Sequence, residues 1–227
     1  MTVTVILGGH GRVGLLIAKE LSKKEDNEVV SIFRNPDQTA EVAATGAIPK
    51  IMNIESATVA DFVEVFKGAD FIVWTAGAGG KGAPSRTYAI DRDAAIRSMQ
   101  AARQVIGIKR YVMISYLGSA NAPQLDPTHP LYHYGQAKHA ADKYLIEFSG
   151  LNYTIVNPGH LSDDAASKKL EFHAKPFNAK DRTASRENVA LLVTDLITDE
   201  KALNHTLGKE VEILDGDTPI LEGLRSL

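Results

Sequence analysis

Short runs of β-branched and aromatic residues alternate along the chain with longer segments in which apolar residues recur every three or four positions. The short runs are typical of strands buried on both faces, and the longer segments are typical of amphipathic helices that cover a sheet. This alternation predicts strand–helix–strand units on a parallel sheet. We expect the strands at residues 3–7, 28–33, 48–52, 71–74, 110–114, 153–156 and 210–214.

Helical periodicity fills most of the intervals between these strands. The helices are expected after the turn at 8–14 and at about 37–44, 59–67, 91–104, 135–148 and 185–198. The predicted fold class is a single Rossmann-type α/β domain of three layers, with a doubly wound and mostly parallel sheet that spans residues 1–227. Residues 158–184 are polar and show no clear period, so we expect them to form a substrate-covering segment, since functional segments gather in long loops.

Composition restricts the function classes. The chain has 227 residues, a formal net charge of -3 and no cysteine. The mild acidic balance gives no electrostatic reason to expect a nucleic acid or a membrane surface as a partner, and the lack of cysteine removes thiolate chemistry and sulfur-ligated metals. No apolar run approaches the ~20 residues that cross a bilayer, and no export signal is visible, so we expect a cytoplasmic protein.

A glycine-rich turn, Gly-Gly-His-Gly-Arg-Val-Gly, follows the first predicted strand and opens the first predicted helix. Glycine lets the backbone turn tightly and approach a pyrophosphate, while the helix amino terminus supplies free N–H groups. The spacing alone is close to chance, and its position between a strand and a helix carries the prediction. The turn residues expected to bind a dinucleotide are Gly8, His10, Gly11, Arg12, Val13 and Gly14.

The ends of the next strands predict which dinucleotide is bound. NAD sites usually place an acidic residue at the end of the second strand, whereas a 2′-phosphate needs a cation there. Arg34 occupies this position and, with help from Arg12, favours NADP(H) over NAD(H); a solvated surface arginine is the alternative. Later strand ends place further residues against the cofactor, and these are Asn53, Ile54, Ala76, Gly77 and Ala78.

Tyr134 and Lys138 are four residues apart in a predicted helix that follows the fifth strand. On a helix face this spacing brings the two side chains together, so the ammonium is expected to lower the pKa of the phenol and prepare it for proton transfer. An exposed pair at the helix start is the alternative. His129 and His133 lie among prolines without a carboxylate cluster, so no metal site is expected.

The glycine turn, a serine at the end of the fifth strand and the Tyr134–Lys138 pair stand in an order that resembles the short-chain dehydrogenase/reductase superfamily. The chain is more similar to its atypical branch of NAD(P)-binding, NmrA-like and epimerase/dehydratase-like proteins. The segments that carry the likeness are residues 8–14, 110–115, 157–159, 185–190 and 215–220. Together they span nearly the whole chain.

The resemblance implies a role for each matching residue. Tyr134 is expected to be the acid/base, Lys138 to hold the nicotinamide ribose and tune the tyrosine, and Ser115 to orient a substrate oxygen. Asn157 and Pro158, where the family tends to have Arg-Pro-Gly, are expected to contact the cofactor. Typical relatives end this strand with paired serines of which the second acts, whereas Tyr116 occupies that position here.

The function expected from these features is an NADP(H)-dependent oxidoreductase that transfers hydride to or from a small carbonyl, quinone or flavin-like substrate. A non-catalytic NAD(P)-sensing regulator with a protein partner is the first alternative, and a nucleotide-sugar epimerase or dehydratase is the second. The sequence leaves the substrate, a protein partner and a homo-oligomeric state open.

Overall fold

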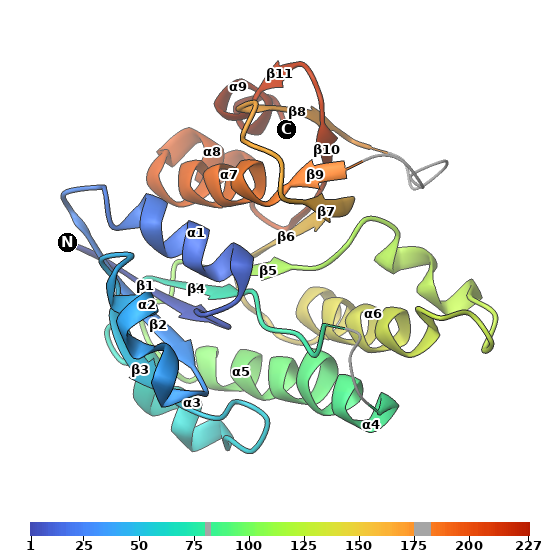
Figure 1. The fold of residues 1–227 in the computed structure, drawn as a ribbon, viewed down its shortest axis with the longest axis horizontal. Helices are drawn as coiled ribbons and strands as arrows, with labels where there is room; N and C mark the ends of the chain where they lie inside the picture. Colours follow the sequence, from blue (N-terminus) through green and yellow to red (C-terminus); the bar gives the residue numbers. More distant parts are fainter. Residues whose placement is uncertain (80–82, 175–182) are drawn as a thin grey trace.

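Helices cover both faces of a central sheet (Figure 1) in the computed structural model, which describes residues 1–79, 83–174 and 183–227. Its strands are β1 (Thr2–Leu7), β2 (Asn27–Phe33), β3 (Ile48–Ile51), β4 (Phe71–Trp74), β5 (Arg110–Ile114), β6 (Tyr153–Pro158), β7 (His160–Ser162), β8 (Lys169–Phe172), β9 (Thr183–Ser185), β10 (Lys209–Asp215) and β11 (Thr218–Pro219). Its α-helices are α1 (Arg12–Leu21), α2 (Thr39–Ala43), α3 (Val59–Phe66), α4 (Pro84–Thr87), α5 (Ala95–Ala102), α6 (Tyr132–Glu147), α7 (Arg186–Thr198), α8 (Glu200–His205) and α9 (Ile220–Ser226). Other helical turns are η1 (Pro36–Gln38) and η3 (Ser119–Gln124), both 3₁₀, and the π-helical η2 (Tyr88–Ala94).

The order of the strands creates the place where a ligand binds. In the described ranges the main sheet runs β11-β8-β10-β6-β5-β4-β1-β2-β3, while β7 and β9 form a separate two-stranded ladder. All pairs from β3 to β10 are parallel, and β8 and β11 add antiparallel strands at one edge. The chain order reverses between β1 and β4, and open α/β sheets bind their ligands beyond the carboxyl ends of the strands at such a point.

Each face of the sheet has its own apolar core, because successive strand residues point to opposite faces. Val73 and Val112 face a core that α1 and α7 complete, whereas Ile72 and Tyr111 face a second core with α3, α5 and α6. The helices accordingly lie in two layers in Figure 1. Burial of each large apolar side chain stabilises the fold by about 1.5–3 kcal/mol, so the sheet is a rigid support for the loops at its carboxyl edge.

The predicted fold class is confirmed: one α/β unit of Rossmann type carries a large, mostly parallel sheet flanked by helices. Two helix starts differ from the prediction. The helix before β5 begins with α4 and continues through η2, and α6 begins at Tyr132, three residues before the expected start at Gly135. No described helix is both long enough and apolar enough to cross a membrane.

Part of the segment expected to cover the substrate takes up regular structure instead. Within 158–184 the chain forms β7 and β8 and enters β9, and β8 pairs with β10 at the edge of the main sheet. These strands are three or four residues long, too short to produce a readable period. Residues 175–182 of the expected cover, and residues 80–82 of the glycine-rich loop after β4, lie outside the described residues. The covering role stays a prediction.

Candidate functional site

The glycine turn between β1 and α1 leaves no room for side chains. Gly8 has a φ of +84°, and a Cβ there would lie 2.7 Å from the backbone of Ala76. A Cβ on Gly14 would lie 2.5 Å from the carbonyl oxygen of Gly8. Gly11 is the N-cap of α1 and has no side chain to cap it, so the first N–H groups of the helix are available to an anion. The turn therefore has the shape and the polarity that a pyrophosphate requires.

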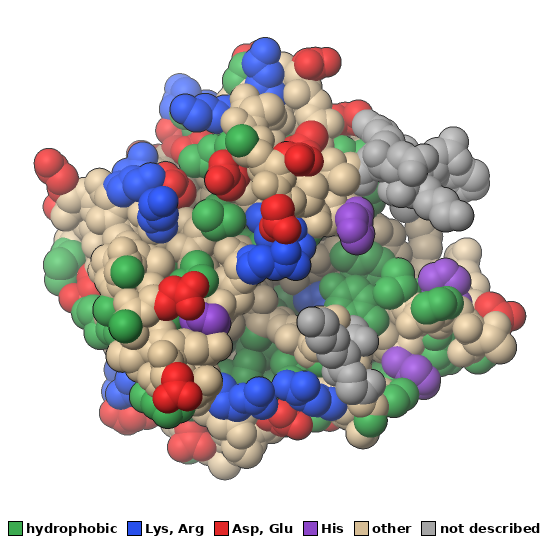
Figure 2. All heavy atoms as spheres, in the orientation of Figure 1, with side chains coloured by type: hydrophobic (Ala, Val, Ile, Leu, Met, Phe, Trp, Pro, Cys, Tyr) green, Lys and Arg blue, Asp and Glu red, His purple; other side chains and the backbone are tan. Residues whose placement is uncertain are grey.

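A cavity of about 420 Å³ opens beside this turn, beyond the carboxyl ends of β1 to β4. The predicted cofactor residues that line it are Gly8, His10, Gly11, Arg34, Asn53, Ile54, Ala76 and Gly77. Figure 2 shows this face of the molecule, where lysine, arginine and histidine side chains border a central hollow. The structure therefore brings together residues from four strand ends that the sequence could only place one by one.

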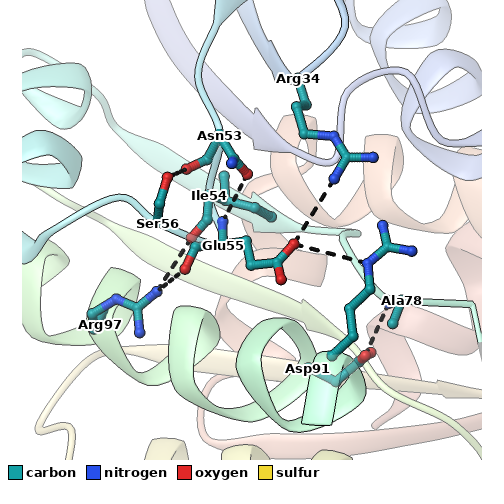
Figure 3. A network of polar contacts seen from close by, with 9 residues as sticks. Arg34, Asn53, Ile54, Glu55, Ser56, Ala78, Asp91 and Arg97 are labelled. Carbon is teal, nitrogen blue, oxygen red and sulfur yellow. Dashed lines mark hydrogen bonds and ion pairs between the residues drawn. The ribbon is translucent and has the colours of Figure 1, made fainter. Parts of the chain in front are cut away.

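Two arginines meet one carboxylate at the end of this cavity (Figure 3). Arg34 Nη1 and Arg86 Nε each lie 3.8 Å from Glu55 Oε2. Arg97 donates to the carbonyl oxygens of Ile54 and Glu55 at 3.3 and 3.0 Å and so fixes the loop that carries the carboxylate. Sequence reasoning missed Arg86 and Glu55, since neither stands directly at a strand end. The site thus contains two guanidinium groups that can bind a phosphate, and the Glu55 carboxylate lies within 3.8 Å of both.

Arg12 is paired with a carboxylate from a distant segment, and its expected help to Arg34 stays a prediction. Its Nη1 donates to both carboxylate oxygens of Asp163, at 3.1 and 2.7 Å, and Arg186 contacts the same carboxylate at 2.7 Å. Asp163 follows β7 and lies 151 positions from Arg12 in the chain, so no local sequence pattern predicts this ion pair. Arg12 is not among the residues that line the cavity. Other predicted residues that do not line it are Val13, Gly14, Ala78, Lys138, Asn157 and Pro158.

Lys138 is buried, and its ammonium donates to the carbonyl oxygen of Ile114 at 2.7 Å. Tyr134 stands in the first turn of α6, with its ring 5.3 Å from that of Tyr116. Burial, and then the charge of Asp91, raise the pKa of the Tyr134 phenol. The expectation that Lys138 lowers this pKa is therefore wrong for this structure, because burial dominates and the ammonium binds main chain instead. The phenol stays protonated at neutral pH and is fitted to donate a hydrogen bond.

Ser115 directly follows β5, and its hydroxyl donates to Asp142 Oδ2. Asp142 lies one helical turn beyond Lys138 in α6 and is 3% exposed. A second buried carboxylate belongs to Asp91 of η2, which is 1% exposed and accepts a hydrogen bond from the backbone N–H of Ala78 at 2.9 Å. Burial raises the pKa of both carboxyls, and the charge of Lys138 offsets only part of the rise. Asp91, Lys138 and Asp142 therefore form a buried ionisable cluster.

The sequence contained a signal for one of the two aspartates. Asp142 is four residues from Lys138, the same spacing that drew attention to Tyr134 on the other side of the lysine. Asp91 carries no comparable signal, since its contact with Ala78 is formed by a loop that sequence patterns do not specify. It stands in a π-helical segment, a form that occurs frequently at functional sites.

Asn157 and Pro158 end β6, next to the end of β5. The Asn157 amide donates to Glu210 Oε2 at 3.0 Å, and the Pro158 carbonyl accepts from the backbone N–H of Leu117 at 2.8 Å. Their contact with a cofactor stays a prediction. His133 lies in the first turn of α6, with its Nδ1 3.3 Å from the Tyr88 hydroxyl. The described ranges contain no group of three or more His, Asp or Glu side chains that would hold a metal ion.

The strand order, the glycine turn and the adjoining cavity define a Rossmann-type protein built to bind a dinucleotide. The chain belongs to the NAD(P)H-binding family, whose model matches residues 8–200. It is 33% identical over 228 residues to a Bacillus subtilis protein described as an uncharacterized sugar epimerase, and the match covers 98% of both chains.

Solved structures agree with this assignment. A Bacillus halodurans protein, provisionally assigned as an NAD-dependent epimerase/dehydratase, is 32% identical, with complete coverage of both chains and a TM-score of 0.87. The oxidoreductase ylbE from Lactococcus lactis is 26% identical over all of this chain and 96% of its own, with a TM-score of 0.83. The family resemblance noted from the sequence is confirmed.

Proposed function

We propose that the protein is an NADP(H)-dependent oxidoreductase that transfers hydride to or from a small carbonyl, quinone or flavin-like substrate. The observation that carries this proposal is a row of complementary groups along the carboxyl edge of the sheet. The cavity is lined by Arg34 and Arg86, by the glycine turn, and by Ala76 and Gly77. Asp91 of the buried cluster lies beside this lining, because it binds the N–H of Ala78, the residue after Gly77, and interacts electrostatically with Lys138.

The residues present fit the cofactor. The space that a Cβ would fill at Gly8 and Gly14 is taken up by the turn itself, and Gly11, the N-cap of α1, lines the cavity. Arg34 and Arg86 supply two guanidinium groups for a 2′-phosphate, in place of the acidic residue that would select NAD. When bound, the cofactor supplies the hydride and its electron pair.

The chain's own groups would then act on the substrate oxygen. Tyr134 of α6 would donate a hydrogen bond to that oxygen, and Ser115, directly after β5, would do the same once its hydroxyl leaves Asp142. Two such donors stabilise negative charge that develops on a carbonyl oxygen. Lys138 would contribute its positive charge, held in place by its hydrogen bond to the Ile114 carbonyl. The acid/base assignment of Tyr134 stays a prediction from the family resemblance.

A regulator that binds the dinucleotide without turnover is the alternative, and Tyr116 favours it. In typical relatives a serine stands at this position, whereas here an aromatic ring packs on Tyr134. Burial raises the pKa of the Tyr116 phenol to about 12, so this group stays protonated at neutral pH. The description of the Bacillus subtilis relative also keeps a sugar epimerase open.

Fluorescence titration with NADPH and NADH, followed by turnover assays, separates these functions. An oxidoreductase consumes NADPH stoichiometrically with at least one member of a panel of aldehydes, ketones, quinones and flavins. Tight binding with no consumption by any acceptor would favour the regulator. Interconversion of nucleotide sugars without net NADPH consumption would favour the epimerase.

A further inference from the structure

Two arginines from distant segments contact one aspartate, and we call them the arginine pair. Arg12, the first residue of α1, and Arg186, the first residue of α7, each donate from Nη1 to the carboxylate of Asp163 at 2.7 Å. The β7–β9 ladder accounts for one of these contacts. Ser162 pairs with Ser185, so the next residues of the two segments, Asp163 and Arg186, are neighbours. Arg12 reaches the same carboxylate from the glycine turn.

The arginine pair has more charge and more donors than Asp163 uses. Two guanidinium groups contact one carboxylate, so the three side chains together carry one net positive charge. In the part of the chain that the structure describes, each guanidinium donates only from Nη1 and only to Asp163. Nε and Nη2 of both arginines can therefore bind a further oxyanion, and these two donors together form parallel hydrogen bonds to a carboxylate.

The partners differ in how firmly they are held. The Arg186 side chain is 12% exposed, and its backbone opens α7 directly after Ser185, whose hydroxyl caps the helix by accepting from the N–H of Asn188. The Asp163 side chain is 68% exposed. An ion pair in such an exposed position contributes little to stability. Arg186 is thus a fixed and mostly buried cation, whereas Asp163 is a partner that another anion can replace.

The order of the strands places the arginine pair towards the substrate side of the proposed site. Arg34, at the proposed 2′-phosphate end, follows β2, whereas β7 continues from β6, on the other side of β1 in the sheet. Lys138 binds the end of β5, the neighbour of β6. Gly11, which precedes Arg12, lines the cofactor cavity, but neither member of the arginine pair lines it. A dinucleotide that extends from Arg34 past the glycine turn therefore directs its far end towards β5 and β6.

We propose that the arginine pair binds a carboxylate group of the substrate, and that Asp163 marks the position of this group. The inference rests on the proposed oxidoreductase function and narrows its substrate class to acceptors that carry an acid group. Tyr134 keeps the acid/base role that the family resemblance gives it, and the arginine pair orients the acceptor. The pyrophosphate of the cofactor has the same oxyanion chemistry, but a substrate is favoured because the pair does not line the cofactor cavity.

A small anion tests the site without turnover. The probe is benzoate, and its neutral isostere benzamide controls for contacts of the ring. In protein labelled with ¹⁵N at arginine and saturated with NADP⁺, we expect benzoate to shift the Nε resonances of Arg12 and Arg186, and benzamide to leave them in place. The resonance of Arg225, which pairs with Asp199, should stay unchanged with both probes. No shift with benzoate would overturn the proposal.

Variants then test the competition between Asp163 and the probe. Arg186→Gln should raise the Kd for benzoate about tenfold or more, because a hydrogen bond between charged groups is lost. Asp163→Asn should lower this Kd about fivefold, because the competing charge is removed. An unchanged or higher Kd in Asp163→Asn would make Asp163 a structural partner and overturn the proposal. If Arg186→Gln fails to fold, Arg186→Lys, which keeps the charge without the planar donors, should still weaken benzoate.

Turnover assigns the anion to the substrate. We expect kcat/KM for 4-formylbenzoate to exceed that for its neutral amide, 4-formylbenzamide, by about 10–100-fold; for a quinone acceptor, 1,4-naphthoquinone-2-carboxylate and its amide form the pair. Arg186→Gln should abolish the preference and leave the Kd values for NADPH and NADH within about twofold of the wild type. Arg225→Gln, which breaks another arginine–aspartate ion pair, should keep the preference.

The remaining outcomes separate this inference from the proposed function. Equal kcat/KM for acid and amide in the wild type would overturn the inference. Equal weakening of NADPH and NADH in Arg186→Gln would overturn it in favour of the cofactor pyrophosphate. If the wild type turns over no acceptor, the proposed function fails, while the benzoate titration still decides whether the arginine pair binds a carboxylate.

Discussion

The two arginines at the end of the cofactor cavity yield the sharpest prediction about cofactor choice. Arg34→Gln removes a guanidinium whose side chain is 59% exposed, and Arg86→Gln removes one that is 39% exposed. A hydrogen bond to a charged group contributes about 1.5–3 kcal/mol, and solvent exposure favours the lower end of that range. We therefore expect the Kd for NADPH to rise about tenfold in Arg34→Gln and somewhat more in Arg86→Gln, because about 1.4 kcal/mol is a factor of ten.

Glu55 makes the same reasoning testable in the opposite direction. Its carboxylate lies 3.8 Å from both guanidinium groups and competes with a phosphate for them. A unit charge at about 4 Å in a water-like environment is worth about 1 kcal/mol, so Glu55→Gln should tighten NADPH binding about fivefold. The double variant Arg34→Gln/Arg86→Gln should lose less than the product of the single effects, because both arginines would contact one phosphate.

Isothermal titration of each variant with NADPH and NADH at two salt concentrations measures these effects. NADH, which lacks the 2′-phosphate, should bind every variant within about twofold of the wild type. Arg12→Gln is the matched control: it also removes an arginine charge beside the glycine turn, but its partner is Asp163 and it does not line the cavity. Equal weakening of NADPH and NADH in Arg34→Gln would refute the assignment of a 2′-phosphate site.

Three further variants test other parts of the structure. Tyr134→Phe should lower kcat about 10²–10⁴-fold by removal of the expected proton donor, with the Kd for NADPH unchanged; an unchanged kcat would remove Tyr134 from the mechanism. Gly14→Ala places a Cβ 2.5 Å from the carbonyl oxygen of Gly8 and should lower the free energy of unfolding by about 1–3 kcal/mol. An unaltered urea midpoint would contradict that contact. Hydrogen bonds from Arg225 lower the pKa of Asp199 to about 2, so the stabilisation is present above the unfolded value of about 3.9 and is lost as pH falls towards 2. Arg225→Gln should therefore lower the urea midpoint at pH 7 and match the wild type near pH 2, and a difference that persists at pH 2 would indicate another cause.

Local features of this protein were predictable from the sequence, and contacts between distant segments were not. The glycine turn and Arg34 were found because each sits beside a strand whose apolar run is readable. The contact of Arg12 with Asp163 was not predicted, because Asp163 comes from a segment without a clear period. The pKa of Tyr134 was expected to fall because spacing reveals a neighbouring lysine, but spacing does not reveal burial, which controls the direction of the shift.

The same limit applies to the buried cluster. The sequence places Ser115 at a strand end and Lys138 on a helix; in the structure Ser115 directly follows β5 and Lys138 lies in α6. The hydrogen bond from Ser115 to Asp142 depends on how α6 packs against β5, and this packing cannot be predicted from either segment alone. Asp91 comes close to Lys138 only through the π-helical turn and the loop after β4.

The hydrogen bond between Ala78 and Asp91 has a thermodynamic consequence. Ala76 and Gly77 line the cofactor cavity, and the next residue in the chain holds one of the two buried carboxyls. A ligand that shifts this loop changes the proton affinity of Asp91, and reciprocity requires that the proton change the affinity for the ligand by the same factor. Dinucleotide binding should therefore be accompanied by net proton uptake or release. Binding of the cofactor and protonation of Asp91 would then form one coupled equilibrium.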